Sequence, residues 1–172
     1  MARIESPSSI TTYNTCPRKY YYSYKLSLPK KDNISAITGK AVHEALEKFF
    51  KLKVEDINYK DYEMELKQYL LVMFNDSWIS HMEDLNKLEI NKDVIRNYYQ
   101  DSYFMLSNFI EDFLQSLKVE IHNSDFENAF NKMRPLTEVY LFSEDHKVQG
   151  YLDVIANING DVYIIDYKTS SK

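Results

Sequence analysis

A hairpin signal near the C-terminus constrains the fold of this chain more than any other feature. Residues 148–156 and 161–168 are rich in β-branched and aromatic side chains, and an Asn-Gly pair at 159–160 lies between them. An Asn-Gly pair in this setting is typical of a two-residue β-hairpin turn. With these two residues as the turn, Ile158 pairs with Asp161, and that pairing sets the register of both strands.

This register brings three charged side chains together. Asp153 lies directly across from Asp166, Tyr151 lies across from Lys168, and alternation along the strand puts Asp153, Asp166 and Lys168 on one face. Two opposed carboxylates repel each other, so we expect a positive charge between them. One source of this positive charge is a divalent cation with oxygen ligands. The alternative is Lys168 alone, which would make a plain ion cluster. The strongly apolar strand before Asp166 favours the metal site over the ion cluster. This placement depends on a two-residue turn, because a three-residue turn would reverse the relative faces of the two strands.

The composition indicates a helical protein with one core. Only 3 glycines and 4 prolines occur in 172 residues, which favours long helices, and 44% of the residues are hydrophobic, as a single domain requires. The net charge is -5, so DNA contacts would have to be local. The single cysteine, Cys16, excludes an internal disulfide and is typical of a reducing compartment. Because no signal peptide or membrane span is indicated, we expect a cytoplasmic protein without membrane contact.

Apolar periodicity predicts a mainly helical segment up to residue 134, followed by a small sheet. Ser8 or Ser9 is the expected cap of the first helix. The sheet would be an antiparallel meander of strands 137–142, 148–156 and 161–168. Because the sequence stops just after the third strand, we expect an incomplete sheet whose edge a partner protein or a second copy would complete. The predicted helices span residues 10–24, 40–53, 60–85, 92–117 and 125–133.

Two further groups of residues are candidates for function. His43 flanks the apolar stripe of the helix 40–53; it is either a boundary histidine with a satisfied hydrogen bond or part of a site that Gly39 opens to a ligand or another backbone.

A basic stretch interleaved with tyrosines comes earlier in the chain. Such side chains can contact phosphates and stack on bases, or they can belong to an amphipathic helix with packed tyrosines and solvated lysines. The candidates for DNA binding are Arg18, Lys19, Tyr20 and Lys25.

Four segments together resemble the PD-(D/E)xK nuclease superfamily, specifically its RecB-like branch, which includes the CRISPR-adaptation exonucleases. Residues 8–24 are similar to the family's N-terminal helix, and residues 39–43 to its Gly-x-x-x-His motif. Residues 150–153 are similar to its Gly-x-x-Asp strand, and residues 166–168 match its (Asp/Glu)-x-Lys strand.

The resemblance implies an α+β or α/β fold with a restriction-endonuclease-like core. Residues 1–172 would form a single nuclease-like domain, with a large helical portion at 1–134 and the catalytic three-stranded sheet at 135–172. The family's Gln-x-x-x-Tyr helix and a further strand do not fit after residue 168, so the domain is expected to be incomplete at its C-terminus.

The function that the resemblance implies is that of a metal-dependent deoxyribonuclease, expected to be an exonuclease in repair, recombination or CRISPR adaptation. The metal, Mg²⁺ or Mn²⁺, would be bound by His43, Asp153, Asp166 and the backbone carbonyl of Tyr167. Lys168 would orient or deprotonate the attacking water. A nitrogen ligand favours Mn²⁺ relative to a site made only of oxygens.

Two residues have open roles. Glu138 is either an acid that supports the metal site from outside or a plain charge at the edge of the first strand. Some family members bind a four-iron cluster, and Cys16 occupies the position of one of its ligands. Because the chain has no other cysteine, it cannot build an iron–sulfur cluster alone, and Cys16 is then a small buried residue.

Two alternatives to the nuclease remain. One is a non-catalytic nuclease-fold module that binds DNA or a partner protein. The other is an acidic helical interaction protein whose motif matches arise by chance.

Overall fold

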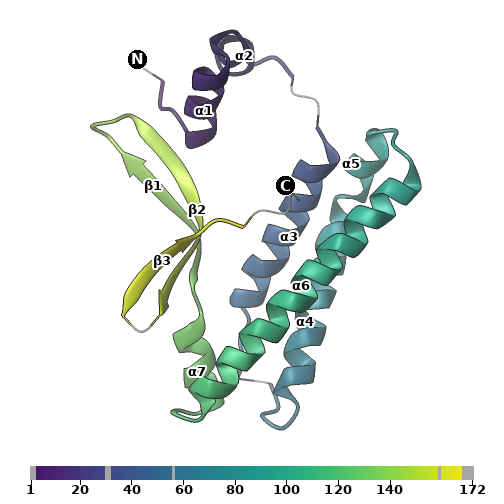
Figure 1. Cartoon of the computed structure of the whole chain (residues 1–172), viewed down its shortest axis with the longest axis vertical. Helices are drawn as coiled ribbons and strands as arrows, with labels where there is room; N and C mark the ends of the chain where they lie inside the picture. Colours follow the sequence, from purple (N-terminus) through teal and green to yellow (C-terminus); the bar gives the residue numbers. More distant parts are fainter. Residues whose placement is uncertain (1–2, 30–31, 56, 159, 168–172) are drawn as a thin grey trace.

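The computed structural model describes residues 3–29, 32–55, 57–158 and 160–167. Within these ranges the chain is a mixed α+β protein in which the helices come first and a three-stranded antiparallel sheet follows (Figure 1). This confirms the predicted fold class and the change from helix to sheet. The elements are α1 (Pro7–Thr15), α2 (Pro17–Tyr20), the π-helical turn η1 (Tyr21–Lys25), α3 (Ile34–Phe50), α4 (Tyr62–Ser80), α5 (Met82–Lys87), α6 (Lys92–Ile121), α7 (Phe126–Met133), β1 (Leu136–Ser143), β2 (Val148–Ile158) and β3 (Asp161–Ile165).

The N-terminal lobe, residues 3–29, is not the single helix that the periodicity predicts. Cys16 has an extended backbone (φ -157°), and its sulfur accepts a hydrogen bond from the Lys19 N–H at 3.5 Å, so Cys16 ends α1 and caps α2. Pro17 explains the break, because proline disfavours helical backbone at the residue before it and suits the first position of a new helix. The cap of α1 is Ser6, which forms a reciprocal capping box with Ser9, and not Ser8 or Ser9 as predicted.

Glu5 joins this lobe to the sheet. Its backbone pairs with β2 through hydrogen bonds of 2.8 Å to the carbonyl of Lys147 and from the N–H of Gln149. Its carboxylate accepts hydrogen bonds from the Ser9 hydroxyl at 2.6 Å and from the Tyr20 hydroxyl at 2.5 Å. The lobe is therefore attached to the first residues of β2.

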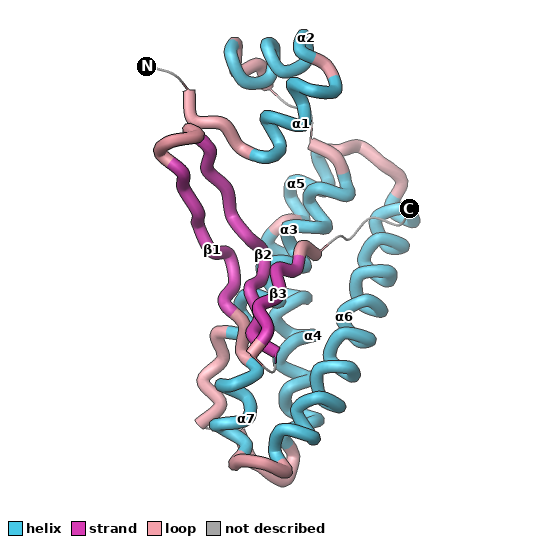
Figure 2. The backbone as a smooth tube through the Cα atoms, turned by 60° about the vertical axis from the view of Figure 1, so that its left-hand side comes forward, coloured by secondary structure: helices cyan, strands magenta, loops and turns pink. Residues whose placement is uncertain are grey.

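The helical body consists mainly of α3, α4 and α6, which run side by side (Figure 2). Phe49 on α3 is fully buried and meets Phe109, Phe113 and Phe130 edge to face. Phe74 and Trp78 of α4 are buried in the same core, whereas Tyr69 of α4 and Tyr103 and Phe104 of α6 are exposed. No helix within the described ranges is long and apolar enough to cross a membrane.

Several helix boundaries differ from the prediction. Helix α3 begins after Asn33, whose side chain accepts from the Ala36 N–H at 2.9 Å, so Gly39 lies inside the helix and not before it. The predicted helix 60–85 is divided into α4 and α5 at His81, where the backbone leaves the helical conformation. Hydrophobic periodicity continues through such a break because both helices bury their apolar faces in one core.

The sheet has the order β1-β2-β3 and is the predicted antiparallel meander. The β2–β3 register runs from Ile158 opposite Asp161 to Val154 opposite Ile165, which is the register that a two-residue turn at 159–160 predicts. Asn159 lies outside the described residues, and Gly160 has a positive φ of 94°. The sheet lies along one side of the helical body, with the N-terminal lobe at the β1–β2 turn and α7 at the opposite end (Figures 1 and 2).

Candidate metal centre

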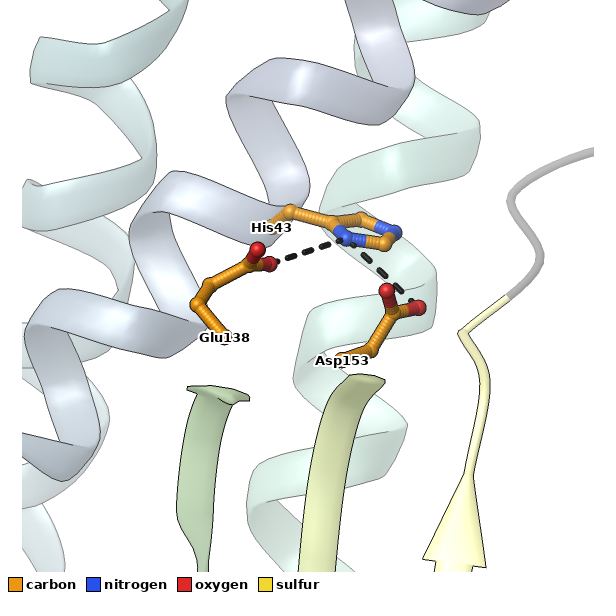
Figure 3. A group of neighbouring side chains, drawn as sticks. All are labelled: His43, Glu138 and Asp153. Atoms are coloured by element: carbon orange, nitrogen blue, oxygen red, sulfur yellow. Dashed lines mark ion pairs between the residues drawn. The ribbon is translucent and has the colours of Figure 1, made fainter. Parts of the chain in front are cut away.

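Three potential metal ligands from three separate elements converge between α3 and the sheet. His43 comes from α3, Glu138 from β1 and Asp153 from β2, and one ligand atom of each lies within 4.8 Å of the others (Figure 3). His43 Nδ1 is 3.7 Å from Asp153 Oδ2 and 3.9 Å from Glu138 Oε1. Two ligand atoms that are each about 2.1 Å from one Mg²⁺ lie roughly 3–4 Å apart, so this spacing suits a shared cation with little adjustment.

Helix α3 places His43 at the boundary between the core and solvent. Its neighbour Val42 and the following Leu46 are buried, whereas the His43 side chain is 27% exposed and faces the sheet. An open cavity of about 530 Å³ adjoins it. The absence of a side chain at Gly39, one turn earlier, widens that cavity. Its lining consists of Gly39, Lys40, His43, Glu44, Glu47 and Glu138.

The orientation of the His43 ring follows from its contact with Tyr167. His43 Nε2 lies 3.2 Å from the Tyr167 carbonyl oxygen, and a carbonyl oxygen can only accept a hydrogen bond. Nε2 therefore carries a hydrogen, and in the neutral ring Nδ1 keeps its lone pair toward Glu138 and Asp153. A second ring nitrogen that donates to a carbonyl is the usual arrangement for a histidine that binds a metal.

Tyr167 also holds Asp153. The Tyr167 N–H donates to Asp153 Oδ2 at 2.9 Å. The Tyr167 ring stands edge-on to His43, with ring centres 6.1 Å apart, and to Phe109 at 6.4 Å. Burial raises the pKa of Tyr167 to about 12, and the negative charge of Asp153 contributes to the increase. Tyr167, two residues beyond the end of β3, thus positions both His43 and Asp153.

Glu138 reaches the site through an unusual backbone conformation. Its φ is 50° within strand β1, a left-handed conformation that costs a non-glycine residue roughly 1 kcal/mol or more. The pairs on either side, Thr137 with Val154 and Val139 with Leu152, keep one register, so no extra residue is inserted. Strained backbone of this kind concentrates at functional sites.

The position of Glu138 beside Asp153 could not be derived from the sequence. In the β1–β2 register Glu138 stands opposite Asp153, so two carboxylates face each other across these strands. The turn between β1 and β2 spans residues 144–147 and contains no Asn-Gly pair, so the register of these two strands could not be derived from it. Glu138 therefore was assigned only a supporting role or none.

The β2–β3 ladder ends one pair before the predicted pair of Asp153 with Asp166. Strand β3 ends at Ile165, and the β2–β3 ladder ends with the Val154–Ile165 pair, so Asp166 is not the ladder partner of Asp153. The physical reason is that the Asp153 carboxylate accepts the Tyr167 N–H, which ends regular pairing. Asp166 is exposed and is not part of the His43–Glu138–Asp153 cluster, and Lys168 lies outside the described residues.

The remaining candidates lie in the N-terminal lobe. Arg18, Lys19 and Lys25 are exposed there. The Tyr20 hydroxyl is bound to Glu5, so Tyr20 takes part in attaching the lobe to the sheet. Cys16 is partly exposed and caps α2, and is not the buried residue that the sequence suggested.

The acidic residues around the cluster have different partners. Glu44 is 2.9 Å from His81 Nε2, and Glu47 pairs with Lys51, the residue that caps the C-terminal end of α3. Within the described part of the chain, Glu138 and Asp153 form an ion pair only with His43. Two carboxylates and one imidazole make a donor set that suits a divalent cation such as Mg²⁺ or Mn²⁺.

An α+β fold in which a helix histidine meets two carboxylates of a small sheet defines a candidate metal-dependent hydrolase. The chain belongs to the PD-(D/E)XK nuclease superfamily, because the sequence profile of that superfamily matches residues 5–172. No curated protein and no solved structure matches the chain. Members of this superfamily are generally metal-dependent nucleases, which agrees with the donor set.

Proposed function

We propose that this chain is a divalent-metal-dependent deoxyribonuclease of the RecB-like branch that hydrolyses DNA phosphodiester bonds. An exonuclease acting in repair, recombination or CRISPR adaptation is the specific role proposed. The observation that carries this proposal is the convergence of His43 Nδ1 with the carboxylates of Glu138 and Asp153. Family membership over residues 5–172 supports it.

The residues that would hold the cation are His43, Glu138 and Asp153, as they lie in the structure. The resemblance adds Asp166 and the Tyr167 carbonyl, and that carbonyl would first have to release its hydrogen bond from His43 Nε2. Glu138 is added to this set because its carboxylate lies 3.9 Å from His43 Nδ1. When bound, a divalent cation polarises a phosphoryl oxygen and lowers the pKa of a coordinated water.

The other proposed roles belong to the segment after β3. Tyr167 positions the His43 ring through its carbonyl and the Asp153 carboxylate through its N–H. Lys168, the next residue in the sequence, would orient or deprotonate the attacking water and stabilise the charge that develops on the phosphate. In the sequence, Asp166 and Lys168 thus stand on either side of Tyr167, the residue that positions His43 and Asp153.

The identity of the metal follows from the donor set. Mg²⁺ prefers a site made only of oxygens, whereas an imidazole nitrogen also suits Mn²⁺. We propose that either ion supports the reaction and that Mn²⁺ binds more tightly.

The test is cleavage of end-labelled single- and double-stranded DNA in Mn²⁺, Mg²⁺ or a chelator. Asp153→Asn removes one carboxylate charge, and Asp145→Asn, in the exposed β1–β2 turn, is the matched control. The proposal expects metal-dependent cleavage by the wild type and by the control, and none by Asp153→Asn. Equal cleavage by all three proteins, or none with any metal, would count against it.

A non-catalytic module that binds DNA or a partner protein is the second candidate. The observation that favours it is the exposed apolar surface of the sheet, where Tyr151, Val162 and Ile164 are each 65–69% exposed. A partner protein or a second copy of the chain could cover this surface or pair with a strand edge. Metal binding without cleavage would favour the module over the enzyme.

A further inference from the structure

The N-terminal lobe differs in charge from the rest of the chain. Residues 3–29 contain four basic residues and one acidic residue, whereas the whole chain carries a net charge of -5. The basic residues are Arg3, Arg18, Lys19 and Lys25. Any attraction for a polyanion is therefore concentrated in this lobe.

Most of this positive charge is available to a ligand. Arg3 pairs with Glu5 at 4.0 Å, but within the described ranges no carboxylate forms an ion pair with Arg18, Lys19 or Lys25. All three side chains are exposed. Phosphate groups bind to side chains of this kind.

The same lobe contains a cavity with an aromatic wall. Its volume is about 500 Å³, which falls within the range of roughly 300–1,000 Å³ for sites that bind small organic groups. Tyr22 is 39% exposed and Leu28 is 50% exposed at this cavity. The lining consists of Thr12, Lys19, Tyr22, Ser23, Tyr24, Leu28 and Pro29.

Both tyrosine rings of the cavity are held by arginines. The Arg18 guanidinium lies 5.7 Å from the Tyr22 ring centre, and its Nε donates to the Tyr22 hydroxyl at 3.2 Å. The Arg3 guanidinium lies 4.6 Å from the Tyr24 ring centre and donates to the Tyr24 carbonyl at 2.6 Å. The rings are thus oriented before a ligand arrives, which lowers the entropy cost of binding.

We propose that this cavity binds an unpaired base of single-stranded nucleic acid, stacked against Tyr22, while Arg18, Lys19 and Lys25 contact the neighbouring phosphates. A single strand exposes the faces of its bases to an aromatic ring, whereas a duplex would first have to unstack and unpair one base. This inference deepens and rests on the proposed nuclease function, because it names single strands as the preferred substrate. It also moves the stacking role from Tyr20, which is bound to Glu5, to Tyr22.

The lobe is attached to the strand that carries Asp153 of the metal centre. Glu5 of the lobe pairs with Val148, and Asp153 follows five residues later on the same strand. Five residues of β-strand span about 17 Å.

The experiment is a fluorescence-anisotropy titration of labelled oligothymidylate of about 15 nucleotides, compared with a duplex of equal length, in chelator so that no cleavage occurs. The variants are Tyr22→Ala, Tyr22→Phe and Lys19→Ala. Tyr69→Ala on α4 and Lys60→Ala are controls at exposed positions elsewhere. Thermal unfolding checks that each variant is folded.

The proposal expects the single strand to bind more tightly than the duplex and Tyr22→Ala to weaken it roughly tenfold or more. Tyr22→Phe should bind nearly as well as the wild type, because the stacking face remains. Lys19→Ala should lower the slope of log affinity against log salt by about 0.7. Both control variants should bind like the wild type.

Three results would overturn the proposal: equal binding of the duplex, wild-type affinity in Tyr22→Ala and Lys19→Ala, or no binding of either nucleic acid. The last would point to a protein partner for the lobe. The nuclease function is tested separately by cleavage in metal. If the protein binds single strands but does not cleave DNA in metal, the cavity proposal stands and the nuclease function is rejected. If it cleaves DNA but the Tyr22 and Lys19 variants bind like the wild type, the nuclease function stands and the cavity proposal is rejected.

Discussion

His43 Nε2 and the carbonyl oxygen of Tyr167 lie 3.2 Å apart, although 124 residues separate them in sequence. Because the carbonyl can only accept, this contact selects the His43 tautomer whose Nδ1 lone pair faces Glu138 and Asp153. Tyr167, in the segment that follows β3, thereby orients His43 of α3 so that its Nδ1 can bind a metal ion. If the carbonyl also bound the metal, as the resemblance implies, this hydrogen bond would have to break.

The tautomer of His43 is directly measurable. We expect ¹⁵N NMR of the metal-free protein to show the His43 hydrogen on Nε2, and Mg²⁺ to shift the Nδ1 resonance more than that of Nε2. His146, in the exposed β1–β2 turn, is the internal control and should not respond. A hydrogen on Nδ1, or a larger shift at Nε2, would contradict the geometry.

Tyr167 should control metal affinity through its position. Tyr167→Ala removes the ring that packs against His43 and Phe109, so metal affinity should fall roughly 10–100-fold, as for other residues that orient ligands. Tyr167→Phe keeps the ring and should bind metal nearly as well as the wild type. Calorimetric titration with Mn²⁺ would decide, and equal affinity of all three proteins would rule out this role.

Tyr167 also predicts how the free energy of unfolding changes with pH in the alkaline range. The pKa of Tyr167 is raised to about 12 in the folded protein, compared with about 10 for an unfolded tyrosine. Because the folded state holds this proton more tightly, its contribution to stability is complete below about pH 10 and is lost as the pH rises toward about 12. Urea unfolding across this range should show a smaller decrease for Tyr167→Phe than for the wild type, and an equal decrease would contradict the assignment.

Because Glu138 has a left-handed backbone, replacing it with glycine should have opposite effects on protein stability and on metal binding. Glu138→Gly should preserve or raise the free energy of unfolding without metal, by up to about 1 kcal/mol, because glycine adopts a φ of 50° without strain. It should also weaken metal binding by removing a ligand. Val139→Gly, the matched change at the next strand position, should destabilise the protein. A similar loss of stability in both variants would indicate that Glu138 is not strained.

Gly150 determines how closely α1 approaches the sheet. A β-carbon at this position would lie 3.3 Å from Pro7 Cδ, so Gly150→Ala should cost little and Gly150→Val about 1–3 kcal/mol through overpacking. The valine should also loosen the N-terminal lobe and expose it to trypsin. Denaturant unfolding and limited proteolysis measure the two effects, and a valine variant like the wild type in both would contradict this account.

The parts of the fold that were predicted from sequence depend on local signals. An Asn-Gly pair between two apolar runs sufficed to derive the β2–β3 register. Apolar periodicity located the main helices, but it could not detect the interruption at His81, where both helices still pack against one core. Pro17 is a local signal for the break after Cys16, which the prediction of one helix over residues 10–24 did not use.

The site was predicted only in part because it is made by long-range packing. His43 and Asp153 were identified from short motifs, but no local pattern indicates that Glu138 adopts a left-handed conformation toward them. The contacts of Tyr167 with His43 and Phe109 depend on how the sheet docks on α3 and α6. Such contacts follow from the whole fold and have no sequence spacing of their own.

Binding of Mn²⁺ to the metal-free protein tests the central claim most directly. Electron paramagnetic resonance counts the free ion in titrations of the wild type, Glu138→Gln, Asp153→Asn and the control Asp145→Asn. We expect the wild type and the control to bind Mn²⁺ with the same affinity, and the Glu138 and Asp153 variants to bind it at least about tenfold more weakly. Equal binding by all four proteins, or none by the wild type, would contradict a metal centre formed by His43, Glu138 and Asp153.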